Sequence, residues 1–126
     1  MPISNKIDKE RRLVVTTISG EHTYAEALDN QRELLEHPDF DPTFAQICDY
    51  SNATLTKFSG GEVAKLAQRS VFSPDSRRAL ILPNLSDYGL GRMYEQLRAL
   101  KGQAGVRSFR TLEEAVDWIA GPLQDT

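Results

Sequence analysis

The sequence has only one cysteine, Cys48, so the chain cannot close an internal disulfide. It has no apolar run approaching the roughly 20 residues of a membrane-spanning helix. The first twelve residues, MPISNKIDKERR, lack the apolar stretch of a secretory signal. These absences predict a cytoplasmic protein without a membrane span. Within the apolar segment FAQICDY, we expect Cys48 to be a small buried side chain rather than a reactive thiol.

Signatures of catalysis and of metal binding are also missing. The two histidines, His22 and His37, do not stand at metal-ligand spacing from one another or from the cysteine. No nucleophile elbow is present, and the turn at residues 59–61 lacks the spacing and the lysine of a phosphate-binding loop. We therefore predict a protein that is not an enzyme and has no cofactor or metal. An enzyme would have to use Asp49, Ser51 or His22, which form no legible nucleophile–base pair.

The charged residues, 26% of the chain, are unevenly distributed. Residues 1–64 carry 6 basic and 11 acidic side chains, whereas residues 65–110 carry 9 basic and 3 acidic ones. The arginines of the second segment are scattered, and no aromatic residues are interleaved with them as in an RNA-binding signature. We interpret them as members of solvated helix faces, and we predict no nucleic-acid partner. These arginines are Arg69, Arg77, Arg78, Arg92, Arg98, Arg107 and Arg110.

Hydrophobic periodicity divides the chain into alternating strands and helices. Strands are predicted near residues 3–7 and at 12–20, 44–50, 78–83 and 105–110, and helices at 23–37, 59–72, 87–102 and 111–121. The strands at 44–50 and 78–83 are apolar on both faces, which is typical of central strands covered by helices on two sides. The apolar stripes of the helices are expected to face inward, including Leu35, Leu100, Leu112 and Val116.

This pattern predicts one α/β domain spanning residues 1–126. Strands that are separated by a helix lie parallel with right-handed crossovers, and a hairpin at the start of the chain supplies an antiparallel strand. We therefore expect an open mixed β-sheet of about five strands flanked by about four helices, in the order β-β-α-β-α-β-α-β-α. An exposed edge of this sheet, or the aromatic residues Tyr88, Tyr94 and Trp118, would offer a homodimer contact.

A binding site is expected where the parallel strands end, because ligands of open α/β sheets gather at the carboxyl ends of the strands. Three loops are predicted to meet there, at residues 19–23, 49–61 and 83–89. The second loop is long and polar, and it runs into the start of a helix, where unpaired amides attract anions. The candidate partner- or ligand-binding residues are Asp49, Ser51, Asn52, Thr56, Lys57, Gly60, Ser86 and Tyr88.

Ser59 is the serine in this region whose role is most open. With Glu62 three residues later it forms a capping box, and Phe58 and Val63 fit a hydrophobic staple, as at the start of an ordinary helix. The other interpretation is that Ser59 accepts a phosphate, which would add nearly two negative charges beside a helix N-terminus.

The second interpretation rests on a resemblance. The segment ICDYSNATLTKFSGGEV, residues 47–63, resembles anti-sigma-factor antagonists of the STAS superfamily, the SpoIIAA-like proteins. The resemblance implies that Ser59 aligns with the serine that a partner kinase phosphorylates, and Gly60 with the glycine after it. Lys57 and Phe58 stand where that family has an acid and a serine, so the phosphorylation motif is reduced to Ser-Gly. Residues 88–95 and 106–119 further resemble small bacterial SpoIIAA-like proteins of unassigned role, which are also similar to the SEC14-type lipid-binding domain.

Two functional hypotheses follow from this resemblance. The first is a non-catalytic regulatory module that binds a protein partner, such as an anti-sigma-factor-like kinase, around Ser59, with or without a working phosphorylation switch. The second is a carrier or sensor of a small apolar or lipid ligand, as the similarity to the SEC14-type domain implies. Amphipathic helices rich in Leu, Met and Tyr accord with the second hypothesis, although such stripes also form ordinary cores.

Overall fold

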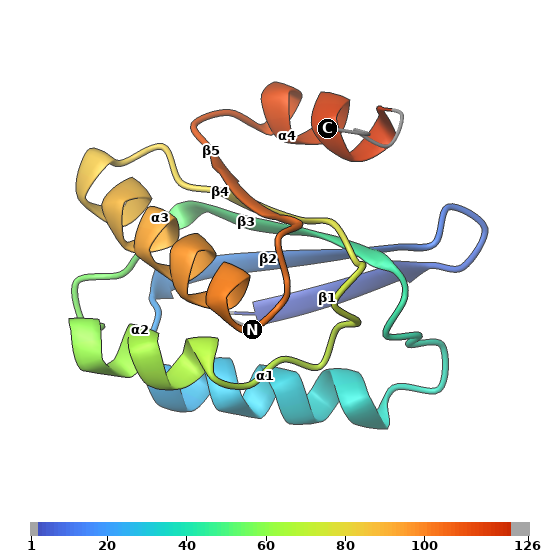
Figure 1. The fold of residues 1–126 in the computed structure, drawn as a ribbon, viewed down its shortest axis with the longest axis horizontal. Helices are drawn as coiled ribbons and strands as arrows, with labels where there is room; N and C mark the ends of the chain where they lie inside the picture. The colour runs from blue at the N-terminus through green and yellow to red at the C-terminus, as the bar shows by residue number, and fades with distance from the viewer. Residues whose placement is uncertain (1–2, 122–126) are drawn as a thin grey trace.

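A computed structural model describes residues 3–121 of the chain, and it contains a five-stranded mixed sheet (Figure 1). The strands are β1 (Ile3–Asp8), β2 (Leu13–Glu21), β3 (Ala45–Thr54), β4 (Arg78–Ile81) and β5 (Val106–Phe109). They lie side by side in sequence order. The opening hairpin makes β1 antiparallel to β2, and the remaining neighbours pair in parallel. The predicted sheet is therefore confirmed.

Four helices cover the sheet unequally. They are α1 (Tyr24–Glu36), α2 (Gly60–Ala67), α3 (Leu85–Leu100) and α4 (Leu112–Ala120). Helices α1, α2 and α3 lie on one face, and α4 lies alone on the other (Figure 1). The element order agrees with the prediction, so the α/β fold class is confirmed.

The central strands are buried on both faces, as their apolar sequences predict. Cys48 and Leu80 belong to a core cluster with residues of α2 and α3, whereas Ile47 and Ala79 belong to a cluster with Ala115 of α4. Alternation along a strand sends neighbouring side chains to opposite faces. A third cluster joins the C-terminal part of α1 to the loops before β3 and β4.

Two predicted boundaries are wrong. Strand β3 continues to Thr54 instead of ending near residue 50, because a bulge opposite Ile18 lets its last residues resume pairing with β2. Helix α2 ends at Ala67 instead of reaching residue 72. Phe72 leaves the helical path and packs in the third cluster with Leu34.

Several apolar side chains that were expected to face inward are exposed. The exposed fractions are 62% for Leu35, 83% for Leu100, 53% for Leu112 and 42% for Val116. Each helix touches its neighbours over a narrower stripe than its apolar residues cover, so the outer members of each stripe remain in solvent.

The aromatic residues proposed for a homodimer contact take part in internal packing. Tyr94 is buried, Trp118 packs against Phe109, and Tyr88 packs on the cluster that contains Cys48. At the outer edge of β5, the Ser108 N–H donates to Glu95 of α3 at 2.7 Å, which protects that edge from pairing with another strand. A homodimer through the β1 edge stays a prediction.

Candidate functional site

A cavity of about 100 Å³ lies between the sheet and the helices α1, α2 and α3. Protein interiors contain few voids larger than a water molecule, whose share of liquid volume is about 30 Å³. The cavity therefore exceeds an ordinary packing defect and is a candidate ligand site. Much of its wall is apolar and comes from strands β2 and β4, the residue after β4, helix α2 and the loop before α2: Ile18, Leu55, Val63, Leu66, Leu80 and Leu82.

One end of the cavity is polar and is built around Arg78, the first residue of β4. Its Nε–H donates to Gln46 Oε1 at 3.0 Å, and its Nη1 donates to the Tyr94 hydroxyl at 2.8 Å. The guanidinium carbon lies 4.9 Å from the centre of the Phe72 ring and 5.5 Å from that of Tyr94. Amide, hydroxyl and aromatic groups therefore hold this cation in place.

Gln46 links Arg78 to a chain of hydrogen bonds that crosses the sheet. Its Nε2 donates to Thr16 Oγ1 at 2.9 Å, and the Thr16 hydroxyl donates to Asn5 Oδ1 at 2.7 Å. The Asn5 amide in turn donates to Asn30 of α1 at 2.6 Å. Gln46 is 3% exposed and Thr16 is fully buried. These hydrogen bonds therefore fix both side chains and, through Gln46, the orientation of Arg78.

The opposite end of the cavity contains His22, which follows β2 and is 4% exposed. Its ring lies 5.9 Å from that of Tyr50 and 5.5 Å from that of Phe58. Burial lowers the pKa of His22, and the carboxylate of Glu26, 3.7 Å from Nδ1, only partly opposes this. Among the described residues, Nδ1 has no hydrogen-bond partner. His22 is therefore a neutral ring in an apolar environment.

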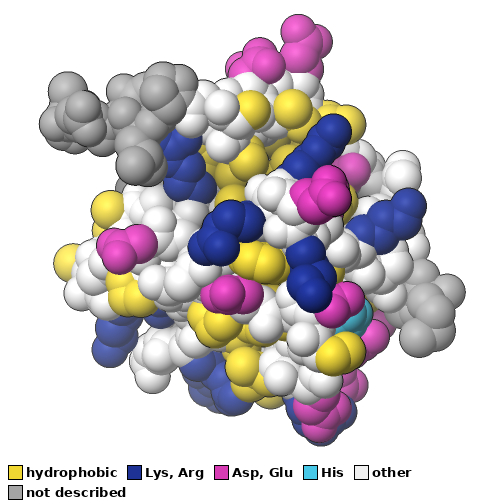
Figure 2. Space-filling view, turned by 90° about the vertical axis from the view of Figure 1, so that its right-hand side faces the viewer, with side chains coloured by type: hydrophobic (Ala, Val, Ile, Leu, Met, Phe, Trp, Pro, Cys, Tyr) yellow, Lys and Arg dark blue, Asp and Glu magenta, His cyan; other side chains and the backbone are white. Residues whose placement is uncertain are grey.

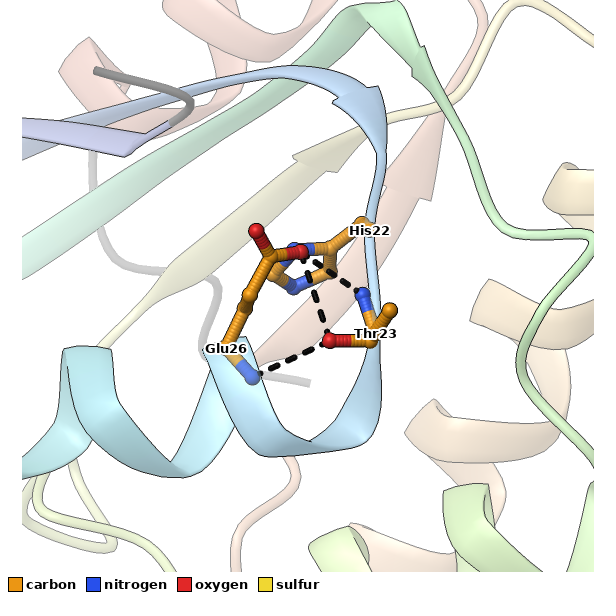
Figure 3. A network of polar contacts seen from close by, with 3 residues as sticks. All are labelled: His22, Thr23 and Glu26. Atoms are coloured by element: carbon orange, nitrogen blue, oxygen red, sulfur yellow. Dashed lines mark hydrogen bonds and ion pairs between the residues drawn. The ribbon is translucent and has the colours of Figure 1, made fainter.

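The carboxylate of Glu26 is committed to the capping box of α1 (Figure 3). Its Oε1 accepts from the Thr23 N–H at 3.0 Å, while the Thr23 hydroxyl accepts from the Glu26 N–H at 3.2 Å. The capping box at the start of α1 therefore accounts for the position of the Glu26 carboxylate beside His22.

Cys48 lines the cavity but has no nucleophilic character. Burial raises the pKa of its thiol to about 11, and a hydrogen bond with Tyr50 lowers it only in part. A thiolate is the reactive form of cysteine, so this side chain is an inert part of the wall, as the sequence predicts.

Ser59 occupies the N-cap of α2 and is exposed. Its hydroxyl accepts from the Glu62 N–H at 3.0 Å, and its own N–H donates to the Glu62 carboxylate at 3.1 Å, which confirms the capping box. Lys57 and Thr56 are exposed in the preceding turn. Phe58, the residue before the cap, lines the cavity, so the exposed serine and the buried site are one residue apart.

Three of the candidate residues lie on β3 rather than in the expected loop. Asp49 accepts a hydrogen bond from the Ser51 N–H at 2.9 Å. Ser51 and Asn52 are exposed, and Asn52 pairs with Ser19 of β2. They are part of the strand because β3 extends to Thr54.

The remaining candidates lie at the starts of two helices. Gly60 begins α2, and a Cβ atom placed on it would lie 3.8 Å from Met93 of α3. Ser86 is exposed in the first turn of α3. Tyr88 is partly buried, with the Arg110 guanidinium 5.9 Å from its ring centre. The start of α2 therefore lies beside the middle of α3, and only the exposed residues could contact a partner.

Sequence reasoning missed the polar end of the cavity. Arg78 was interpreted as part of a solvated helix face, but it lies on a strand and lines the cavity, and Arg98 is buried as well. A charged residue at the start of a strand that is apolar on both faces was the available signal. On the face seen in Figure 2, basic and acidic side chains are interspersed, without the continuous basic surface that nucleic acids bind.

Among residues 3–121, neither a metal-binding cluster nor a helix fit to cross a membrane is present. This part of the chain contains no cluster of three or more His, Cys, Asp or Glu side chains that could hold a metal ion. None of its helices has the length and hydrophobicity needed to cross a membrane.

Comparison with known proteins identifies the fold. No protein-family model matches the chain, and no curated protein matches it at a significant level. Among solved structures, it is similar to an uncharacterized DUF3478-family protein with a SpoIIAA-like fold from Shewanella loihica PV-4. The similarity has a TM-score of 0.54 and 15% sequence identity, and it covers 94% of this chain and 92% of that one. The chain therefore has a SpoIIAA-like fold, which confirms the resemblance at the level of fold.

Proposed function

We propose that this protein is a non-catalytic binding module that holds a small apolar ligand in the cavity beneath α1, α2 and α3. The observation that carries the proposal is the cavity itself, a space of about 100 Å³ with a largely apolar wall. An engineered apolar cavity of about 150 Å³ is enough to bind benzene. The ligand is accordingly small, and a whole phospholipid would not fit without a change of structure.

A substitution that fills the cavity tests this proposal. Ala27 of α1 lines the cavity, whereas Ala25 on the same helix is exposed. Leucine is a good helix former at either position, so Ala27→Leu and Ala25→Leu differ mainly in whether the new side chain enters the cavity.

The assay is native mass spectrometry of the purified protein, together with its unfolding midpoint in the presence of benzyl alcohol. We expect benzyl alcohol to raise the midpoint of the wild type and of Ala25→Leu, but not that of Ala27→Leu. A wild type that carries no ligand mass and gains no stability from the probe would contradict the proposal.

A second candidate function is the docking of a protein partner, such as an anti-sigma-factor-like kinase, around Ser59. It is supported by the exposure of Ser59 at the start of α2 on a SpoIIAA-like fold. A phosphate there would lie against the free amides of the first helical turn, where a negative charge is stabilised. Phosphopeptide mapping of protein isolated from its own cells tests the candidate, with Ser86 as the internal control. An unmodified Ser59 under every growth condition would count against it.

A further inference from the structure

We propose that the ligand of the cavity is a small anion, a monocarboxylate whose carboxylate binds the guanidinium of Arg78 and whose apolar body lies along β3 and β4. This inference rests on the proposed function and adds the chemical class of the ligand. It depends on three features of the polar end: the absence of a counter-ion, the unused hydrogen-bond donors, and the gradient of polarity along the cavity.

The first feature is that Arg78 has no acidic partner. None of the ion pairs within residues 3–121 includes it. Its neighbours are the neutral groups of Gln46, Tyr94 and Phe72. Arginine keeps its charge under all ordinary conditions, and a partly buried charge without a counter-ion is unfavourable. An anion bound in the cavity would supply the missing counter-ion.

The second feature is that the guanidinium retains free donors. It has five N–H groups, and the hydrogen bonds to Gln46 and Tyr94 use two of them. Nη2 donates to no described residue. The fork of an arginine matches the two oxygens of a carboxylate, so the free donors suit that group. Since Gln46 is fixed by Thr16, the fork is oriented before the ligand arrives, which reduces the entropy lost on binding.

The third feature is a gradient of polarity along the cavity. Gln46 pairs with Arg78 at the amino ends of β3 and β4, and Cys48 pairs with Leu80 two residues further along. Leu82 lies at the far end, about 13 Å from Arg78 at the rise of an extended strand. The cavity thus has one cationic end and an apolar body, the complement of a short amphiphile.

His22, at the opposite end, favours the same orientation. Its lowered pKa keeps the ring neutral, and the Glu26 carboxylate lies 3.7 Å from Nδ1. A carboxylate would be repelled by Glu26 at this end, whereas the apolar body of the ligand can pack against Tyr50 and Phe58, which surround the histidine ring.

Arg98 provides the contrasting case within the same chain. It is also buried and has no acidic partner in the described part of the chain, but it donates to the Ala67 carbonyl at 2.9 Å and to Gln103 Oε1 at 2.9 Å. It does not line the cavity. Main-chain and amide oxygens thus fix Arg98 as a structural link between α2 and α3, so its surroundings supply a matched control for Arg78.

The experiment adds a counter-ion to each arginine in turn. Gln46→Glu is nearly isosteric and places a carboxylate 3.0 Å from Arg78 Nε, where it competes with an anionic ligand. Gln103→Glu makes the same change beside Arg98, outside the cavity. Circular dichroism and the unfolding midpoint establish that each variant is folded.

Binding is measured by isothermal titration calorimetry with hexanoate and benzoate, and with hexanamide and benzamide as uncharged analogues of the same shape. We expect the wild type and Gln103→Glu to bind each acid at least tenfold more tightly than its amide. In Gln46→Glu we expect at least a tenfold loss of affinity for the acids and little change for the amides. Acetate, which has no apolar body, should bind at least tenfold more weakly than hexanoate.

The outcomes separate this inference from the proposed function. If acids and amides bind equally, and Gln46→Glu changes neither, the ligand is not an anion at Arg78, although the cavity still binds apolar molecules. If Gln103→Glu weakens acid binding as much as Gln46→Glu does, the effect is not local to Arg78 and the inference is overturned. If no probe binds, both the inference and the proposed function fail.

Discussion

A side chain at Gly105, which precedes β5, is predicted to destabilise the fold. A Cβ atom at this position would lie 2.7 Å from the carbonyl oxygen of Ser76 and 3.6 Å from the Cα of Arg77. Both atoms belong to the backbone, so a rotamer change cannot relieve the contact. The Gly105 carbonyl also accepts from the Arg78 N–H at 2.7 Å, so displacing residue 105 would disturb the start of β4 and the polar end of the cavity.

The expected cost of Gly105→Ala follows from two opposing effects. Inserting a methyl group into a close contact costs about 1–3 kcal/mol. The loss of backbone freedom in the unfolded chain offsets this by about 0.4–1 kcal/mol. The two ranges leave a net destabilisation of about 0–2.6 kcal/mol, and we expect a value in the upper half because both contacting atoms are backbone. Gly89→Ala within α3 should act in the opposite direction, because nothing lies within 4 Å of its Cβ position and alanine favours the helix by about 1 kcal/mol.

Urea unfolding, followed through the fluorescence of the single tryptophan, measures both variants against the wild type. Gly105→Ala should unfold at a lower urea concentration and Gly89→Ala at a higher one, with unchanged slopes. If Gly105→Ala proves as stable as the wild type while Gly89→Ala behaves as expected, the close approach of Gly105 to Ser76 does not exist in solution.

Three further predictions concern the helix cap, the buried histidine and the thiol. Ser59→Ala should lower the unfolding free energy by about 1 kcal/mol, because it removes the N-cap of α2. Ser86→Ala, the control, should change the unfolding free energy little. Equal effects of the two substitutions in urea unfolding would refute the role of Ser59 as a cap. The folded protein depresses the pKa of His22, so the unfolded chain binds more protons below about pH 6.5 and stability should fall as the pH is lowered through that value. Urea unfolding at several pH values should show that His22→Gln reduces this dependence, whereas His37→Gln should leave the His22 contribution in place. The thiol of Cys48, with a pKa raised to about 11, should react with a disulfide reagent only after unfolding; rapid reaction of the folded protein would show that the cavity wall opens.

The layered fold and the helix starts were predictable because their causes are local. The strand around Ile47 and Cys48 has adjacent apolar residues that point to opposite faces, which indicates burial on two faces before any partner is known. The caps at Thr23 and Ser59 depend on an acid three residues later in the sequence. Such signals span only a few residues, so they can be recognised without knowledge of the rest of the chain.

The candidate site was predicted only in outline. The exposed turn around Ser59 lies at the start of a helix, as expected from its sequence. The bulge that extends β3 depends on its pairing with β2, so the strand positions of Ser51 and Asn52 could not be read from the segment alone. Arg78 was grouped with the surface arginines because its burial depends on Phe72 and Tyr94, which lie on other elements.

By itself, the sequence determined which segments become strands and helices, in what order, and which of them lie at the centre of the sheet. Only the tertiary structure decided that a space remains beneath α1, α2 and α3, and that a cation with no acidic partner among residues 3–121 lies at its end. Gln46, Arg78 and Tyr94 meet there, although they are 32 and 16 positions apart in the sequence. Periodicity and capping report interactions within a turn or two of chain, whereas a cavity is defined by side chains that fail to fill the space between distant elements.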